Sequence, residues 1–410
     1  MSLNILNCNN YFYIRGGSDK IFFDHMKIMD EMNHTSIPFA PKDEKSINTK
    51  WDKYFTDAID ISNPEIKKMP NFFYNVNAKK NLEKLLFENS INIAHLHIYY
   101  GRLTTSILDV LYKKSIPIIQ TLHDYKLICP NNNLINNEKI CEFCNGNLFF
   151  KSILKKCNDS SLIKTTTLAI ESHFSRINGD IFKINHFIAV SEFLKKKLVQ
   201  YGLDENKISV VHNPIDISKY KPNYNSSKYF LYFGRIEKIK GIKSMIEAAI
   251  KSNIDLKIVG DGNEKMKLEN EYNGNNKIEF LGFKTGNELK HLIQNSLVTI
   301  CPSICYDIFP TSILESFAYG KPVIGSNIGG IPELVENNIN GYLYDPGNIE
   351  QLSSIMNDFK KNPKLSYNLG INARSKVEEK FNKSIYYQKI MKIYSKYTKS
   401  ENKKNIYCSK

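Results

Sequence analysis

Short apolar runs alternate with longer amphipathic stretches along the whole chain. In the first half the runs predict strands at Leu3–Leu6, Ile91–Ile98, Ile116–Leu122, His186–Val190 and Lys207–Val211. After a polar stretch, Ser218–Lys228, the alternation restarts and predicts strands at Tyr229–Phe233, Ile254–Gly260, Ile278–Phe283, Leu297–Ile300 and Lys321–Ile324. Apolar strands separated by helices form parallel sheets. The pattern predicts an α/β fold of two similar halves joined by a linker.

Composition is that of a soluble globular enzyme. Of 410 residues, 42% are hydrophobic and 24% are charged, and the length suits two domains of roughly 200 residues each. No run approaches the roughly 18 apolar residues of a transmembrane helix. The first residues lack the basic and apolar segments of a signal peptide. We expect a cytoplasmic protein whose eight cysteines form no disulfide scaffold.

The formal net charge of +14 leaves several partners open. Phosphorylated ligands and an anionic membrane surface are candidates, and much of the lysine could equally be plain solvated surface. No zinc-finger, helix-turn-helix or RNA-binding signature accompanies the charge, so we expect no nucleic-acid partner. The basic, apolar-flecked stretch Leu148–Gln200 fits either lipid headgroups or helices that pack on a sheet.

Several predicted strands end at residues suited to binding an anion. Arg15-Gly16-Gly17 follows the first strand and precedes a predicted helix at Asp19–Met32, an arrangement that favours a phosphate. His123 directly follows the strand Ile116–Leu122, and Arg235 and Lys240 lie in the turn after Tyr229–Phe233. In parallel sheets these carboxyl ends border the ligand site.

Two carboxylates mark the last part of the chain. Asp307 lies in a loop, and Glu315 lies eight positions later on a predicted helix, Thr311–Tyr319. The string continues as S-F-A-Y-G-K-P-V-I-G-S, then G-G-I-P-E-L-V, then N-G-Y-L-Y-D-P-G. It resembles the donor-binding half of the retaining glycosyltransferases of family 4, whose pattern is E-x7-E followed by A-x-G-x-P-V. Here the first acid is Asp307 instead of glutamate, which is one methylene longer.

The resemblance implies the glycosyltransferase B fold, in which two Rossmann-like domains face a central cleft. Residues 1–215 would bind the acceptor, residues 216–383 would bind the nucleotide sugar, and a last helix at about 384–410 would cross back to the first domain. The implied catalytic residues are His123, Asp307, Arg235 and Lys240. The implied donor-binding residues are Gly17, Arg235, Lys240, Phe283, Ile308, Phe309, Thr311, Ser312, Leu314 and Glu315.

The implied activity is transfer of a sugar from a UDP- or GDP-sugar to a saccharide acceptor, with retention of configuration. The acceptor would belong to cell-envelope polysaccharide or lipopolysaccharide synthesis and could be lipid-linked, met at the inner membrane face. No D-x-D motif is clear in a loop, so we expect catalysis without a metal ion or other cofactor. Another enzyme on this fold, such as a nucleotide-sugar epimerase, or a non-enzymatic basic binding protein stays open as an alternative.

Four cysteines cluster in one segment after His123. Cys129, Cys141, Cys144 and Cys157 have the spacing C-x11-C-x2-C-x12-C. A C-x2-C pair is typical of tetrahedral zinc sites, whereas small buried thiols are the alternative. A zinc ion here would be structural and would take no part in transfer.

Overall fold

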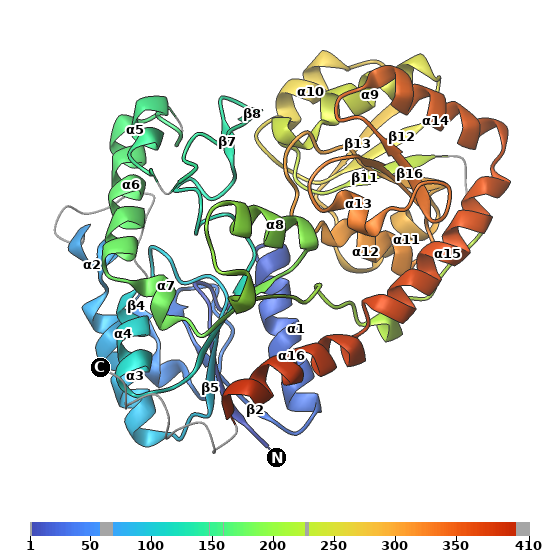
Figure 1. The fold of residues 1–410 in the computed structure, drawn as a ribbon. Coiled ribbons are helices and arrows are strands. Elements are labelled where there is room, and N and C mark those ends of the chain that lie inside the picture. Colours follow the sequence, from blue (N-terminus) through green and yellow to red (C-terminus); the bar gives the residue numbers. More distant parts are fainter. Residues whose placement is uncertain (1, 58–68, 147, 159, 226–228, 399–410) are drawn as a thin grey trace.

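The computed structural model describes residues 2–57, 69–146, 148–158, 160–225 and 229–398, and within them the chain forms two six-stranded parallel sheets (Figure 1). The first sheet has the order β10-β9-β6-β5-β1-β2. Its strands are β1 (Asn4–Cys8), β2 (Thr35–Phe39), β5 (Ile93–Leu96), β6 (Ile118–Leu122), β9 (His186–Ala189) and β10 (Ile208–Val210). Helices of the same half are α1 (Gly17–Glu31), α2 (Met69–Phe73), α3 (Val76–Glu88), α4 (Ser106–Lys113), α5 (Lys151–Lys155), α6 (Leu162–Ile177), α7 (Asp180–Lys183) and α8 (Glu192–Gln200).

The second sheet has the order β13-β12-β11-β14-β15-β16. Its strands are β11 (Phe230–Phe233), β12 (Leu256–Val259), β13 (Ile278–Gly282), β14 (Val298–Cys301), β15 (Val323–Ser326) and β16 (Gly341–Tyr344). The helices that follow are α9 (Ile242–Lys251), α10 (Lys265–Glu271), α11 (Gly286–Gln294), α12 (Thr311–Ala318), α13 (Ile331–Leu334), α14 (Ile349–Lys361), α15 (Lys364–Lys380) and α16 (Lys383–Thr398). The predicted α/β class with two parallel sheets is confirmed.

One part of the expected arrangement is wrong. The predicted strands do not include β2, which forms the edge of the first sheet and pairs with β1 along its whole length. Pro38 lies within β2, opposite Asn7. An edge strand tolerates proline because one side of its backbone needs no hydrogen-bonded neighbour. The pairs β3 (Pro41–Lys42) with β4 (Thr56–Asp57) and β7 (Ile135–Asn136) with β8 (Lys139–Ile140) add small ribbons.

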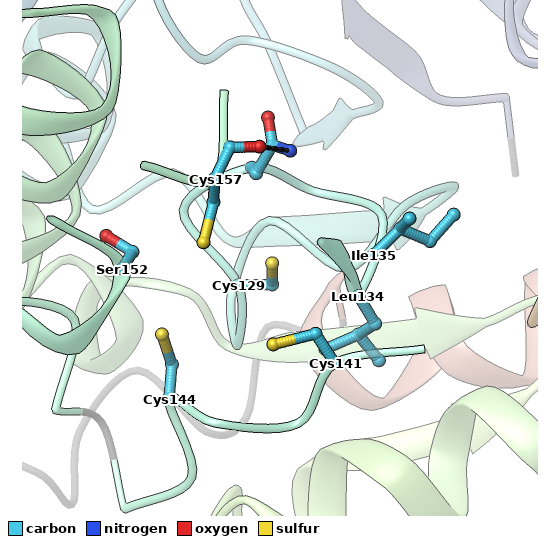
Figure 2. A pocket seen from close by; sticks show the side chains of 8 residues that line it. Cys129, Leu134, Ile135, Cys141, Cys144, Ser152 and Cys157 are labelled. Carbon is cyan, nitrogen blue, oxygen red and sulfur yellow. Dashed lines mark hydrogen bonds between the residues drawn. The ribbon is translucent and has the colours of Figure 1, made fainter. Parts of the chain in front are cut away.

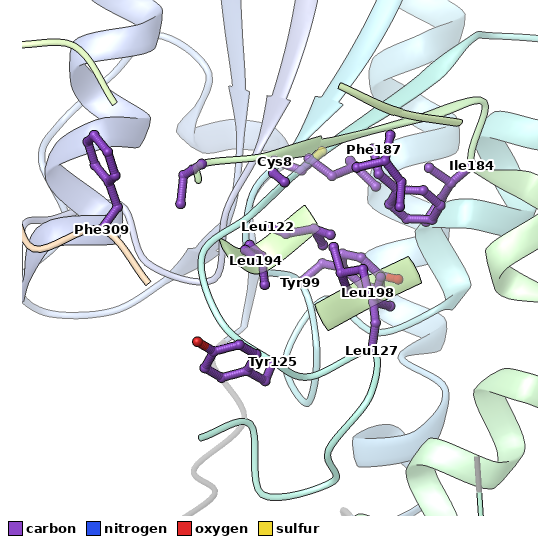
Figure 3. Packing of buried hydrophobic residues seen from close by; sticks show 14 of the residues in the cluster. Cys8, Tyr99, Leu122, Tyr125, Leu127, Ile184, Phe187, Leu194, Leu198 and Phe309 are labelled. Carbon is purple, nitrogen blue, oxygen red and sulfur yellow. The ribbon is translucent and has the colours of Figure 1, made fainter. Parts of the chain in front are cut away.

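The largest core cluster spans both halves of the chain. Figure 3 shows part of it, with Leu122, Phe187 and Leu198 from the first half and Phe309 from the second. Phe309 stacks on His212 with ring centroids 5.1 Å apart and meets Phe381 edge-on. The two domains therefore share buried apolar surface beside the linker.

The chain passes between the domains twice, and the two passages lie side by side. The N–H of Ile215 donates to the carbonyl of Phe381 at 2.8 Å, and Ile215 forms a parallel bridge with Asn382. Beyond Asn382, α16 returns to the first sheet, where Tyr386, Ile390, Ile393 and Tyr394 are buried against Ile5 and Ile93. Residues 399–410 of the predicted last helix lie outside the described residues.

Candidate functional site

The order of the second sheet reverses between β11 and β14. In doubly wound sheets, ligands bind outside the carboxyl ends of the strands at such a point. The turn with Gly234 and Arg235 follows β11, and the loop 302–310 follows β14. The residues that the sequence analysis selected in this half therefore converge where the topology places a ligand.

Lys240 and Asp307 form an ion pair at this point. Lys240 Nζ lies 2.5 Å from Asp307 Oδ1, and the side chains are 15% and 18% exposed. The hydroxyl of Ser303 donates to Asp307 Oδ2. The next residue, Gly241, makes this approach possible, because a Cβ there would lie only 2.0 Å from the carbonyl oxygen of Pro302.

The pair is charged despite its burial. Burial disfavours the cation of Lys240, yet the Asp307 carboxylate raises the pKa of Lys240 above its usual value. Burial likewise opposes the charge of Asp307, but Lys240 and Ser303 lower its pKa below the usual value. The site therefore holds a fixed positive and a fixed negative charge at neutral pH.

Arg235 adds a second, more exposed cation. Its side chain is 71% exposed, and NH1 lies 2.8 Å from Glu237 Oε1. Its charge also lowers the pKa of Asp307. The turn beneath it is closely packed, since a Cβ on Gly260 would lie 1.8 Å from the carbonyl oxygen of Gly234. Only glycine fits there, and the backbone that carries Arg235 is held against β12.

The N-terminus of α12 lies next to the ion pair and faces the first domain. Pro310 precedes the helix, and no side chain caps the first turn. Uncapped N–H groups at a helix start favour an anion. Gly17, which opens α1, lies across from this turn, because a Cβ on it would be 3.6 Å from Thr311 Oγ1. Ser312 is partly exposed but Leu314 is buried, so Leu314 offers a ligand only its backbone.

Glu315, one turn into α12, is paired with a residue that the sequence analysis missed. Lys20 Nζ of α1 lies 2.7 Å from Glu315 Oε1, with side chains 34% and 20% exposed. Burial disfavours the Lys20 cation, but Glu315 and Tyr220 raise its pKa above the usual value. A lysine in the first turn of a helix carries no sequence signal for such a contact across domains.

His123 is held by a second histidine at the end of β6. Its Nε2 lies 2.8 Å from His97 Nδ1, and the two rings stack. Burial lowers the pKa of His123 to about 4, and burial together with His95 lowers that of His97, so both rings are neutral. The buried Nε2 of His97 has no hydrogen-bond partner among the described residues.

The unpartnered Nε2 of His97 indicates which nitrogen of His97 and which nitrogen of His123 carries the proton. A buried N–H without an acceptor is costly, so His97 keeps its proton on Nδ1 and donates it to His123 Nε2. His123 then carries its own proton on Nδ1, which is the atom that the ring can offer to a ligand. His95, in contrast, is satisfied at both nitrogens, by Tyr394 and Thr121.

Three predicted donor-binding residues lie apart from these charges. Phe283 follows the edge strand β13 and is 73% exposed. The ring of Phe309 is buried in the core shared by the domains. The carbonyl of Ile308 is covered by Gly330, on which a Cβ would lie 1.9 Å from the oxygen. Cys129, Cys141, Cys144 and Cys157 line a separate cavity.

Contacts between the domains place the loop 302–310 against the first domain. The hydroxyl of Tyr125 donates to the carbonyl of Tyr306 at 3.0 Å, and the hydroxyl of Tyr306 donates to Glu142 Oε1 at 3.0 Å. On another side, the Glu333 carboxylate accepts from the N–H groups of Glu192 and Phe193, at 2.8 and 2.6 Å. Loops at the carboxyl ends of both sheets thus face one another.

Comparison with known proteins agrees with this arrangement. Residues 15–219 match the family model described as Glycosyltransferase Family 4, and residues 215–376 match the one described as Glycosyl transferases group 1. An uncharacterized glycosyltransferase of Methanocaldococcus jannaschii is 26% identical over 315 residues, which cover 76% of this chain and 77% of that protein.

Two further similarities concern a curated enzyme and a solved structure. The N,N'-diacetylbacillosaminyl-diphospho-undecaprenol alpha-1,3-N-acetylgalactosaminyltransferase of Campylobacter jejuni is 27% identical, over 53% of this chain and 62% of that protein. The crystal structure of HepE from Anabaena in complex with UDP-glucose has a TM-score of 0.67 and 18% identity, covering 96% of this chain and all of that one. The epimerase and non-enzymatic alternatives are not favoured.

Within the described residues, no helix has the length and apolarity needed to cross a membrane.

Proposed function

The chain belongs to glycosyltransferase family 4, and from this premise we propose that it transfers a sugar from a nucleotide-diphosphate donor to a saccharide acceptor with retention of configuration. The observation that carries the proposal is the Lys240–Asp307 pair beside the uncapped start of α12, at the reversal point of the second sheet. Cleavage of the anomeric bond leaves negative charge on the diphosphate. A fixed cation, an exposed Arg235 and a helix N-terminus are groups that stabilise such charge.

Each remaining group has a role in this proposal. Asp307 holds Lys240 in place and orients a sugar hydroxyl, while His123 offers its Nδ1 proton to the sugar. Glu315 accepts hydrogen bonds from the donor ribose. In the present arrangement Glu315 binds Lys20, so a ribose hydroxyl would replace Lys20 as the partner of this carboxylate. In this proposal Arg235 and Lys240 stabilise the negative charge of the diphosphate, so no metal ion is needed.

The proposed donor is tested with a panel of nucleotide sugars, assayed for slow donor hydrolysis and for thermal stabilisation. We expect Arg235→Ala and Lys240→Ala to lower turnover by about 10²–10³, the loss typical of one preorganised electrostatic group. Lys238→Ala is the matched control, because Lys238 lies on the same turn but binds Glu138. Near-normal turnover in both site variants would show the assignment to be wrong.

We further propose that the acceptor is lipid-linked and met on an anionic membrane surface. The helices α5, α6 and α7 lie along one flank of the first domain (Figure 1). They present Leu154, Ile163, Ile177 and Phe182 with 73%, 79%, 87% and 80% of their surface exposed. Lysines interleave with these residues, since Leu148–Gln200 contains nine Lys or Arg against four Asp or Glu. The Campylobacter relative is named for a diphospho-undecaprenol acceptor.

Vesicle sedimentation tests this surface. Each lysine near anionic lipid contributes about 1 kcal/mol, so a handful suffices for reversible attachment at low salt. We expect binding to phosphatidylglycerol vesicles and its loss in Ile163→Asp and Phe182→Asp. Met266→Asp is the control, since Met266 of α10 is 76% exposed on the second domain. Protein that stays in the supernatant when the vesicles sediment at low salt would contradict the membrane proposal.

A further inference from the structure

Four cysteines of the segment 129–157 line one small cavity in the first domain. Figure 2 shows the sulfur atoms of Cys129, Cys141, Cys144 and Cys157 facing one another across it. The cavity has a volume of about 10 Å³, which is room for one water-sized particle. The cysteines are 28 positions apart at most, so local turns, and not the sheet, bring them together.

Local hydrogen bonds of the backbone hold the segments that carry these thiols together. The ribbon of β7 and β8 brings the N–H of Cys141 to the carbonyl of Leu134 at 2.8 Å, which returns the chain towards Cys129. Asn131 Nδ2 donates to the carbonyl of Cys157 at 2.7 Å. The turn that follows Cys129 is thereby tied to the end of the segment at Cys157.

The cluster is unexplained as a set of free thiols. No disulfide joins them, since Cys129, Cys141, Cys144 and Cys157 are all free. A bound divalent ion would give the four sulfur atoms a common partner, because it deprotonates coordinating thiols outright. As the side chains are placed, the described residues contain no group of three or more His, Cys, Asp or Glu positioned to hold a metal ion. The sulfur atoms must move together to bind one.

We propose that Cys129, Cys141, Cys144 and Cys157 bind one structural Zn²⁺ as a tetrathiolate site. The ion would lie about 2.3 Å from each sulfur. Each thiol that becomes a thiolate releases its proton to solvent, so binding strengthens as pH rises. The set is all sulfur, which suits zinc better than the hard ions magnesium and calcium.

The site has a consequence for the loop 302–310 of the second domain. Glu142 lies between Cys141 and Cys144, and its Oε1 accepts from Lys197 Nζ at 2.6 Å and from the hydroxyl of Tyr306 at 3.0 Å. Tyr306 directly precedes Asp307. A zinc ion would therefore fix the turn that carries Glu142, and through Tyr306 it would support the position of the Asp307 loop.

Elemental analysis of the full chain, purified without a metal-affinity tag, tests the site. We expect about one equivalent of zinc per chain and replacement by Co²⁺ to give the charge-transfer and visible bands of tetrahedral cobalt thiolate. Cys129→Ser and Cys144→Ser should lose the metal. Two matched controls should retain it: Ser152→Ala, which alters the same cavity without removing a sulfur, and Glu142→Ala, which alters the turn but leaves all four thiols.

The wild type alone also decides the matter if a cysteine variant fails to fold. A chelator should release the zinc and make these four thiols reactive, and added Zn²⁺ should protect them again. Zinc below about 0.1 equivalent after incubation with Zn²⁺ would overturn the proposal. So would iron with inorganic sulfide, disulfides among the four cysteines, or zinc retained by a Cys129→Ser/Cys144→Ser double variant.

Discussion

Replacing Lys240 with methionine separates the structural and electrostatic roles of the Lys240–Asp307 pair. At 2.5 Å, the gross attraction is about 6–7 kcal/mol for an effective dielectric constant of about 20, and desolvation cancels much of it. Removing one partner of a buried pair costs about 3–5 kcal/mol. Because 15% and 18% of the side chains are exposed, we expect about 2–3 kcal/mol, or a thermal midpoint lower by about 4–12 °C.

The double variant Lys240→Met/Asp307→Asn makes the prediction sharp. Asp307→Asn alone should destabilise by a similar amount, since it leaves the Lys240 cation unpaired. Removing both charges should return the stability to within about 1 kcal/mol of the wild type. Turnover should not return with it, because the proposed role of Lys240 is to stabilise the charge of the diphosphate, and we expect a loss of about 10²–10³.

Scanning calorimetry and donor hydrolysis on the same preparations measure the two effects. Lys238→Met is the control for loss of a lysine from the same turn, and it should change neither quantity. If the double variant were no more stable than the less stable of the two single variants, the inferred pairing would be refuted. A stable double variant with wild-type turnover would refute the electrostatic role instead.

Three other measurements test the site and the core. Turnover without added divalent ions should stay within about twofold of turnover with Mg²⁺ or Mn²⁺, since protein cations answer the charge; strict dependence on either ion would contradict this. Glu315→Gln should weaken donor binding by about 10–100-fold with little change in kcat, as loss of a charged acceptor does, and an unchanged dissociation constant in calorimetry would remove Glu315 from the ribose. Burial lowers the pKa values of His25, His123 and His186 to about 3, 4 and 4, so the unfolded state binds more protons below about pH 6.5 and stability should fall by up to ~1.4 kcal/mol per pH unit for each histidine. Asp124, whose pKa burial raises to about 6, partly opposes that loss below pH 6, and an unchanged urea midpoint between pH 6.5 and 5 would contradict the assignment.

The sequence predicted the parts of the fold that local patterns determine. The apolar run Ile116–Leu122, for example, contains β6, Ile118–Leu122, in which every residue is buried. The edge strand β2 was missed because Pro38 breaks the pattern and its partner β1 is distant in sequence. Pairing of that kind depends on tertiary context, which local propensity does not describe.

The charged residues of the site were predictable for a different reason. Arg235, Lys240 and Asp307 follow strand ends, and topology alone brings such positions to one edge. The contacts of Lys20 with Glu315 and of Glu142 with Tyr306 were not predictable. Each joins residues more than a hundred positions apart, and one of each pair lies on a different domain. Their chemistry is ordinary for exposed residues, so the sequence gives them no distinguishing mark.

The paired passages at Ile215 and Asn382 define a hinge. Two domains whose connecting segments lie side by side move relative to each other mainly by rotation about that place. The rings of His212, Phe309 and Phe381 pack together beside the linker and would shift little. Exposed polar contacts between the domains, such as Lys238 with Glu138, are ones that water can replace at small cost. We therefore expect the nucleotide to enter and leave by a swing of the second domain about this place.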